Sequence, residues 1–485
     1  MIFNSVTYLI FLMVVVLLYW MLEQRSRLVM LFIGSLIFYA FWRIEFLPVM
    51  LLSVITDYIV ALRIYNTKEH KNKKLLLLIS LAVNLGLLIY FKYLLFFANN
   101  AIGLMNFMGI TADPLVLNII LPLGISFYTF QTISYTVDVY RGFIKPERDF
   151  ILYSCYVTFF PQLVAGPILR AVEVIPQLSR RPKFEVSFLG IGLRRILYGL
   201  FLKVVLADNI APMVDAGYGQ PLEHLSAIDV WTLAFLFGFQ IYFDFSAYSH
   251  IALGSARLMG ISFPENFNFP YLSVSPRDFW KRWHISLSSW IRDYLYLPLA
   301  GRQVQDRSTG GIETSPGTQS NQWKLGALYT TWAIMGLWHG ASWTFLIWGL
   351  YHACFIFLYR IVTPLFKNLS ENTRVLGGWA VTLPVIMLGW IPFRAQNMSV
   401  VMGMFSKILQ PHEYLWLGLR ENTYVLAAFI LLAIIITYLI KRFIVPAYSR
   451  QPLLSIAGES ILFSIIIGLV FVFLRPINQF IYFQF

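Results

Sequence analysis

Apolar runs separated by short polar connections fill most of the chain. A helix needs roughly 20 predominantly apolar residues to cross the ~30 Å hydrocarbon core of a bilayer, and many segments reach or approach that length. We therefore predict an all-α polytopic membrane protein, with one membrane domain over residues 1–485. The apolar runs are 6–22, 28–42, 47–62, 75–97, 115–135, 151–163, 186–206, 230–245, 325–340, 341–358, 379–393, 424–440 and 461–474.

Three of these runs need separate interpretation. Runs 151–163 and 325–340 are short for a full span, which is typical of re-entrant segments that protein or a cavity surrounds. The first run, 6–22, has no basic residues before it and no small-residue cleavage site after it. We therefore expect a retained helix and not a secretory signal.

Short basic loops predict the orientation, because Lys and Arg concentrate on the cytoplasmic side of membrane proteins. Arg25 and Arg27 follow the first run, and further Lys and Arg residues lie between Arg63 and Lys74. We expect these loops in the cytoplasm, which places the N-terminus outside. The basic stretch 257–324 is expected on the cytoplasmic side as well, and the acidic connection 215–229 on the outer side.

Composition indicates that lipid surrounds much of the chain. Hydrophobic residues make up 58% and charged residues 13%, about half the roughly 25% of soluble domains. The net charge of +13 needs no nucleic-acid partner, since basic loops and anionic lipid headgroups account for it. Cys155 and Cys354 lie in apolar runs without CxxC or Cys/His spacing, so we predict neither a disulfide framework nor a metal site.

One ionisable residue, His339, lies near the middle of the apolar stretch 325–358. Such side chains are costly at membrane depth and usually face a cavity or a partner, so we expect a functional role; the alternative is a packed histidine bonded to a backbone group. The sequence has no HExxH pair, Walker loop, GxSxG elbow or Rossmann fingerprint, which leaves general base catalysis by the imidazole. For His352 and His250 we expect structural roles.

Residues 243–301 depart from the apolar pattern. The segment is aromatic but charged and contains four prolines, so we predict short re-entrant or interfacial helices and turns. Ser275 is expected to cap a helix that continues to about Tyr294. On it, His284 shares a face with Trp280 and Leu287. His284 is either a second functional histidine or a helix-surface residue bonded to a carbonyl.

A polar insert follows this segment. Residues 302–324 are rich in Gly, Ser and Thr with almost no apolar content, which is typical of a flexible surface loop. We expect this loop in the cytoplasm. It is either a tolerated insertion or an element that gates a donor site or docks a soluble protein.

Six sequence blocks, in order over most of the chain, resemble those of the membrane-bound O-acyltransferases, and especially the membrane subunits of alginate-type polysaccharide O-acetylation. Each block alone would be weak, but together they are specific. The resemblance implies about eleven transmembrane helices and re-entrant pieces around a central tunnel, which donor and acceptor enter from opposite sides. The blocks are PLGISF (122–127), FPQLVAGP (160–167), YFDFS (242–246), DFWKRWHISL (278–287), GLWHG (336–340) and IPFR (391–394).

The same resemblance implies roles for individual residues. His339 matches the family's catalytic histidine and His284 a second functional position. We expect His339 to remove the acceptor's proton and His284 to orient the donor or stabilise the oxyanion. Basic residues would attract an anionic donor or serve as interfacial anchors, while Asp244 and Asp138 would orient an imidazole or pair with an Arg. The donor-binding or tunnel-lining candidates are Arg277, Lys281, Arg282, Trp283, Arg292, Trp338, Asp244 and Ser246.

The implied function is acetyl transfer across a bacterial inner membrane. The donor would be acetyl-CoA or an acylated carrier protein, with no bound cofactor, and periplasmic partner proteins would complete transfer to an exopolysaccharide. A D-alanyl transferase that takes its acyl group from a carrier protein for a cell-wall polymer shares these blocks. A transporter would show inverted repeats, which the two halves lack, and a non-catalytic flippase or scaffold would tolerate loss of His339.

Overall fold

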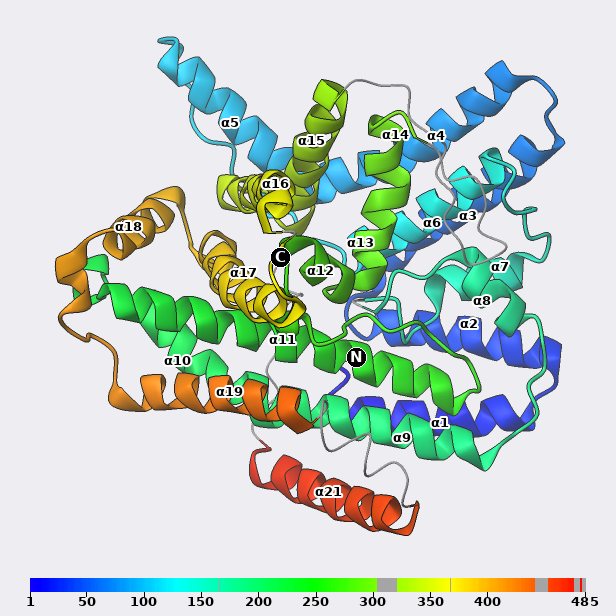
Figure 1. The fold of residues 1–485 in the computed structure, drawn as a ribbon. Helices are drawn as coiled ribbons and strands as arrows, with labels where there is room; N and C mark the ends of the chain where they lie inside the picture. Colours follow the sequence, from blue (N-terminus) through cyan, green and yellow to red (C-terminus); the bar gives the residue numbers. More distant parts are fainter. Residues whose placement is uncertain (165, 303–320, 367, 441–451, 475–479, 482–485) are drawn as a thin grey trace.

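The chain folds as an assembly of helices, seen in a computed structural model that describes residues 1–164, 166–302, 321–366, 368–440, 452–474 and 480–481. Within these residues there is no β-strand, as predicted. The longest helix, α11, crosses the middle of Figure 1, with α1, α9 and α19 lying beneath it and α12 and α13 near the centre.

The helices up to the centre of the chain are α1 (Val6–Met21), α2 (Gln24–Ala40), α3 (Leu47–Asn66), α4 (His70–Leu88), α5 (Leu94–Phe107), α6 (Ile125–Tyr140), α7 (Phe150–Thr158), α8 (Ala171–Leu178), α9 (Val186–Leu200), α10 (Asp208–Tyr218) and α11 (Ala227–Leu258). The later helices are α12 (Pro276–Arg282), α13 (Ile285–Ile291), α14 (Leu297–Leu299), α15 (Asn321–His339), α16 (Trp343–Val362), α17 (Glu371–Arg394), α18 (Met398–Ile408), α19 (Glu421–Leu439) and α21 (Pro452–Val472). π-helical turns at Ile89–Tyr93, Phe201–Ala207 and Arg292–Tyr296 connect consecutive helices.

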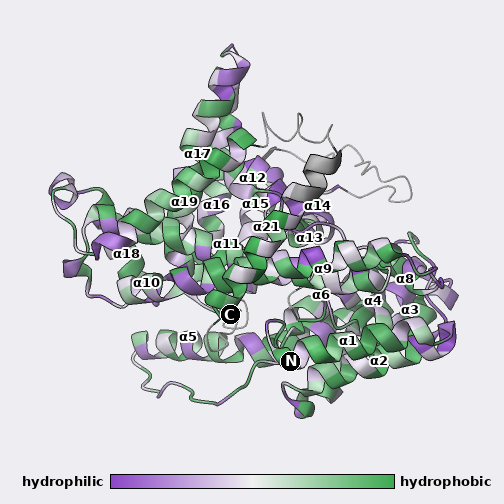
Figure 2. Ribbon diagram, turned by 90° about the horizontal axis from the view of Figure 1, so that it is seen from below, coloured by the Kyte–Doolittle hydropathy of each residue, from purple (hydrophilic) through white to green (hydrophobic). Residues whose placement is uncertain are grey.

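Six helical segments in the described part of the chain are long and apolar enough to cross a membrane. They are Ile44–Asn66, His70–Phe107, Ala227–Leu258, Trp343–Phe366, Glu371–Arg394 and Glu421–Leu439. The membrane character is therefore confirmed, whereas the number of eleven spans and the continuous tunnel stay predictions. Figure 2 shows hydrophobic residues along most of the long helices.

The helix α1 has one apolar face that is buried and another that is exposed. Tyr8, Leu12, Val15 and Tyr19 recur at three- and four-residue spacing and are buried against the protein. Other apolar positions on this helix are exposed, and Met21 is 78% exposed. In water such a surface would be an aggregation liability, but a bilayer solvates it.

The helix α11 is the central element, packed against α9, α10 and α17. A helix that is hydrophobic around its whole circumference is buried on all sides, and most of α11 is buried. Close approach to α9 depends on small residues: a Cβ added at Gly254 would lie 2.6 Å from the carbonyl oxygen of Gly192. Ser226 caps the helix by accepting a hydrogen bond from the Asp229 amide (3.1 Å).

Two predicted boundaries are wrong. The run 115–135 is not one helix, because Pro122 cannot donate within a helix and Gly124 adopts a left-handed φ of 71°; α6 begins only at Ile125. The segment 243–301 does not begin as short pieces, since α11 continues to Leu258. The short helices and turns start beyond it. Most of the polar insert 302–324, namely 303–320, lies outside the described residues.

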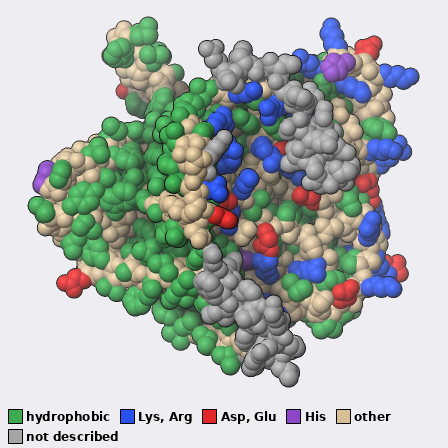
Figure 3. All heavy atoms as spheres, viewed as in Figure 1, with side chains coloured by type: hydrophobic (Ala, Val, Ile, Leu, Met, Phe, Trp, Pro, Cys, Tyr) green, Lys and Arg blue, Asp and Glu red, His purple; other side chains and the backbone are tan. Residues whose placement is uncertain are grey.

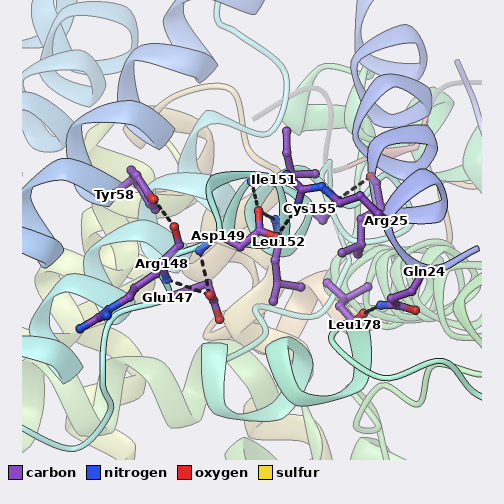
Figure 4. A network of polar contacts seen from close by, with 11 residues as sticks. Gln24, Arg25, Tyr58, Glu147, Arg148, Asp149, Ile151, Leu152, Cys155 and Leu178 are labelled. Atoms are coloured by element: carbon purple, nitrogen blue, oxygen red, sulfur yellow. Dashed lines mark hydrogen bonds and ion pairs between the residues drawn. The ribbon is translucent and has the colours of Figure 1, made fainter.

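The short run 151–163 enters the protein body as α7, and polar contacts hold its start (Figure 4). Asp149 caps the helix by accepting hydrogen bonds from the amides of Ile151 (2.9 Å) and Leu152 (3.3 Å), and it pairs with Arg25 at the start of α2. The Tyr58 hydroxyl on α3 donates to the carbonyl oxygen of Arg148 at 2.5 Å. These contacts tie the entrance of α7 to α2 and to the candidate span that contains α3.

Candidate active site

His339 is the last residue of α15 and is only 3% exposed. Two glycines bring this helix against α16. A Cβ added at Gly336 would collide with the carbonyl oxygen of Phe345, and one at Gly349 with that of Trp332. The imidazole of His339 lies in a cage of aromatic rings, with centroid distances of 4.9 Å to Trp338, 4.8 Å to Trp348 and 5.2 Å to Phe393.

The end of α15 is held by the π-helical turn Ile89–Tyr93. The last four carbonyl groups of a helix have no partner within it, and this turn supplies donors to three of them. Lys92 Nζ donates to the carbonyl oxygens of Trp338 (2.6 Å) and His339 (3.2 Å), and the Tyr93 hydroxyl donates to that of Leu337 (3.0 Å). A cation at this position also opposes the negative end of the helix dipole.

His284 does not lie within a continuous helix, contrary to prediction. The expected cap is confirmed, because Ser275 Oγ accepts from the Asp278 amide (3.0 Å), but α12 ends at Arg282 and α13 starts at Ile285. Between them His284 adopts a left-handed φ of 40° and is fully buried. Left-handed backbone at a residue other than Gly, Asn or Asp is strained and persists where surrounding contacts enforce it.

The enforcing contacts come from Asn266. Its side-chain oxygen lies 3.2 Å from His284 Nδ1 and accepts from the Ser286 amide (3.2 Å) and hydroxyl (2.9 Å). Its amide nitrogen donates to Ser249 Oγ on α11 at 3.3 Å. Since an amide oxygen only accepts, Nδ1 of His284 carries the proton, and the acceptor lone pair of the ring is on Nε2.

The indole of Trp338 lies between the two imidazoles. Its ring centroid is 6.4 Å from that of His284 and 4.9 Å from that of His339. Phe127 and Phe130 of α6 pack on the same indole, at 5.8 Å and 5.4 Å. The structure therefore brings together the two histidines that the sequence analysis selected, from elements 55 positions apart in the numbering.

A small cavity adjoins His339. Its volume is about 40 Å³, and its wall includes Lys92, Gly124, Ser126, Trp338 and His339. At roughly 10–15 Å³ for each water, this volume holds about three water molecules or a group of similar size. The PLGISF block thus contributes backbone and hydroxyl groups opposite the imidazole.

The predicted basic residues lie at the surface of the short helices. Arg277, Lys281 and Arg292 are exposed, and Arg282 pairs with Asp278 at 2.9 Å. Figure 3 shows Lys and Arg side chains gathered in the right half of the molecule, while hydrophobic side chains dominate the left half. Their role toward a donor stays a prediction.

Other candidates belong to the protein's interior packing. Trp283 is 1% exposed and packs 4.9 Å from the Trp390 ring. Asp244 accepts from Lys203 Nζ (2.6 Å) and from the Ile481 amide (2.7 Å). Its contacts in the described part of the chain include neither imidazole, so the interpretation of Asp244 as an imidazole-orienting carboxylate is wrong. Ser246, two residues further along α11, is buried.

Asp138 likewise has a partner other than an imidazole. Its Oδ2 accepts from the Tyr294 hydroxyl at 2.7 Å. His250 Nδ1 lies 2.9 Å from Arg195 NH1, and His352 packs against Trp280 and Trp348 at 5.0 Å and 4.9 Å. Among the residues that the structure describes, no three His, Cys, Asp or Glu side chains are grouped to hold a metal ion.

Both histidines lie within a region of the chain that matches a known protein family. The family model described as "MBOAT, membrane-bound O-acyltransferase family" matches residues 147–393, just over half of the chain and including both histidines. The chain belongs to the membrane-bound O-acyltransferase family. It is therefore an acyltransferase, and the resemblance inferred from the sequence blocks is confirmed.

Several relatives of the O-acyltransferase are named for polymer modification. The "Probable alginate O-acetylase AlgI" of Pseudomonas aeruginosa is 36% identical over 84% of this chain and 74% of its own length. The "Peptidoglycan O-acetyltransferase" of Helicobacter pylori is 35% identical over 76% of this chain and 71% of its own. The "Teichoic acid D-alanyltransferase" of Bacillus subtilis is 29% identical over 56% and 66%.

Sequence reasoning missed three residues around the histidines of this O-acyltransferase. Lys92 lies near the end of the apolar run 75–97, where a lysine is as typical of an interfacial anchor as of an ionisable residue at membrane depth. Asn266 and Ser286 carry no comparable signal, because amides and hydroxyls near turns are common. Only the folded structure shows that they converge on His284.

Proposed function

We propose that this O-acyltransferase moves an acetyl group from a cytoplasmic thioester, acetyl-CoA, to a hydroxyl presented from the opposite face of the bacterial inner membrane, and that periplasmic partner proteins complete O-acetylation of an exopolysaccharide. The relatives with the greater coverage and identity carry O-acetylase or O-acetyltransferase names, whereas the D-alanyltransferases cover less of the chain. The cavity of about 40 Å³ beside His339 supports a short acyl group.

The observation that carries this proposal is the buried pair of imidazoles around Trp338. In the proposed reaction, His339 accepts the proton of the acceptor hydroxyl as its oxygen attacks the thioester carbonyl. The carbon–sulfur bond then breaks, and the thiolate leaves with the proton that the imidazolium returns. His284, fixed by Asn266, orients the thioester or stabilises the charge that develops on its carbonyl oxygen.

The test uses purified full-length protein in lipid nanodiscs and acetyl-CoA labelled in the acetyl group, with and without a periplasmic extract. Label should appear on polymer, on a periplasmic protein or as released acetate. His339→Gln and His339→Ala should abolish this turnover. His412→Gln is the matched control, since His412 is an exposed histidine whose loss should change nothing.

Two outcomes would overturn the proposal. Turnover from an acylated carrier protein, with none from acetyl-CoA, would replace the donor and favour the D-alanyl type of transfer. Full turnover by correctly inserted His339→Gln protein would show that the imidazole of His339 takes no part in the chemistry.

A further inference from the structure

An apolar cavity lies between α19 and the helices α9, α10 and α11. Its volume is about 560 Å³, which is within the 300–1,000 Å³ range of small-molecule sites. The wall also includes residues of the π-helical turn Phe201–Ala207 and of the segment 269–272. No residue of this wall, which lies wholly in the described part of the chain, is charged. The cavity therefore suits an apolar occupant.

Direct contacts hold α19 to the protein at its start. The Tyr424 hydroxyl bonds to Asp229 of α11, which also accepts from the Gly418 amide (2.9 Å). Thr423 is the only buried residue of α19, all of which the structure describes, and further along the helix Phe429 is 65% exposed. An empty apolar cavity loses the dispersion contacts of its lining, and water finds few polar partners there. We therefore expect an apolar molecule between α19 and the protein.

The dimensions of the cavity fit one hydrocarbon chain. Its wall on α19, a candidate span, extends from Leu426 to Thr437, a rise of ~17 Å. This is close to half of the ~30 Å hydrocarbon core, the depth of one leaflet. The volume spread over that length gives a mean cross-section of roughly 33 Å². A helix with its side chains is about 10–12 Å wide and needs roughly 80 Å² or more, so a partner helix does not fit.

Two arginines follow one end of the cavity. Arg195 and Arg194 precede the wall residue Tyr198 by three and four positions on α9, so they lie on the same face of that helix. Arg194 pairs with Glu459 at 2.8 Å and Arg195 with Glu265, and both arginine side chains are accessible. A guanidinium group has five donors, so each arginine can bind a phosphate in addition to its carboxylate.

The cavity also adjoins the segment that holds His284. Tyr242 and Tyr271 of its wall each lie 6.1 Å from the Trp283 ring, and Trp283 directly precedes His284. Phe269, another wall residue, has a left-handed φ of 46°, a strained conformation that surrounding contacts must maintain. An occupant of the cavity would thus support the packing behind His284.

We propose that this cavity binds a phospholipid, with one acyl chain between α19 and the path from α9 to α10, and with the phosphate at Arg194 and Arg195. The lipid attaches α19 where direct contacts end and stabilises the wall behind Trp283. It is a structural ligand and not a substrate, since neither His339 nor His284 is part of the cavity wall. The inference is therefore independent of the donor and the acceptor of acyl transfer.

Filling the cavity tests the acyl chain. Ala433 is part of the wall, whereas Ala428 is exposed on the same helix outside it, so Ala433→Trp and Ala428→Trp form a matched pair. Each protein is purified in detergent, incubated with dioleoyl phosphatidylglycerol and examined by native mass spectrometry. We expect a retained phospholipid in wild-type and Ala428→Trp protein, and roughly tenfold lower retention in Ala433→Trp, because the indole overpacks the path of the chain.

The phosphate is tested in the same measurement. Dioleoylglycerol has the same chains without a phosphate and should be retained about fivefold less, and Arg194→Gln should lower phosphatidylglycerol retention by a similar factor. Arg181→Gln, a change at an exposed arginine outside the wall, should have no effect. Equal retention of the two lipids would overturn the role of the phosphate. Equal retention by Ala433→Trp and Ala428→Trp, or a retained polypeptide in place of lipid, would overturn the acyl chain.

A photoreactive phospholipid gives a test that needs no variant. With the phosphate at Arg194, the chain extends from Tyr198 toward Ile210, so a diazirine at the chain terminus should label α10 and one beside the headgroup should label α9. The same labelled peptides from both probes would overturn the proposed binding mode. Added phosphatidylglycerol should also raise the thermal midpoint of delipidated wild-type protein more than dioleoylglycerol does, and equal shifts would contradict phosphate recognition.

Discussion

Replacing Asn266 tests whether His284 acts through a fixed orientation. In Asn266→Ala, the His284 Nδ1–H and the amide and hydroxyl of Ser286 lose their shared acceptor. Each buried hydrogen bond contributes about 1 kcal/mol net, and an orphaned donor costs about 1–3 kcal/mol. We therefore expect a loss of about 3 kcal/mol in stability.

The effect on catalysis should be seen in kcat, because Asn266 is not part of the wall of the cavity beside His339. If a third to a half of the lost energy had fixed the imidazole for the transition state, kcat falls about tenfold, which corresponds to ~1.4 kcal/mol. The assay is initial-rate kinetics in nanodiscs, normalised to the folded fraction, with a thermal midpoint measured in parallel.

Ser249→Ala is the matched control for this prediction. It removes only the bond on the other side of the same amide, Asn266 Nδ2 to Ser249 Oγ at 3.3 Å, and should cost at most about 1 kcal/mol with kcat preserved. Equal losses of kcat in Ser249→Ala and Asn266→Ala would show that the shared oxygen does not position the ring. An unchanged kcat in folded Asn266→Ala protein would show that the fixed orientation of His284 does not contribute to catalysis.

Three further substitutions test the packing around the site. Gly336→Ala should lower the thermal midpoint and the rate, since its Cβ collides with the carbonyl oxygen of Phe345. Gly326→Ala on the same helix is the control: its Cβ meets open space, so it should be neutral or stabilising by up to about 1 kcal/mol. Equal effects of the two substitutions would contradict the close approach of α15 and α16. Lys203→Met should destabilise by about 3–5 kcal/mol in denaturant titrations, because two buried carboxylates lose their cation, and wild-type stability would disprove the buried cluster. Arg394→Ala should change thermal stability by less than about 1 kcal/mol, as its partner carboxylate is well exposed; a large loss would mean that this residue of the IPFR block does more than pair at the surface.

Membrane character and the choice of His339 and His284 follow from the sequence because both depend on local signals. Apolar runs of span length require a lipid-facing or buried helix. An imidazole at membrane depth is costly, so its presence there indicates a function. The break between α12 and α13 has no such signal, because neither Trp283 nor His284 is a helix breaker. Tertiary hydrogen bonds impose it: the Asn266 carbonyl accepts from the Ile285 amide at 2.9 Å.

Lys92 was overlooked for a different physical reason. Lys92 lies close to the end of the run 75–97, and a lysine at the end of an apolar run is typical of an interfacial anchor whose ammonium group reaches the lipid headgroups. The helix in fact continues to Phe107, so that position lies deeper than the run suggests. The length of the helix beyond an apolar run therefore decides whether a terminal charge is an anchor or part of a site.

The π-helical turn Ile89–Tyr93 has a consequence for how this helix can vary. A π turn holds one residue more than an α-helical turn of the same height, so it shifts the angular phase of everything that follows. Deleting one residue there would restore a regular helix and rotate Asn99 by roughly 100° relative to the cytoplasmic half. The number of residues in this turn, more than their identity, sets the angular position of Asn99 relative to the basic end of the same helix.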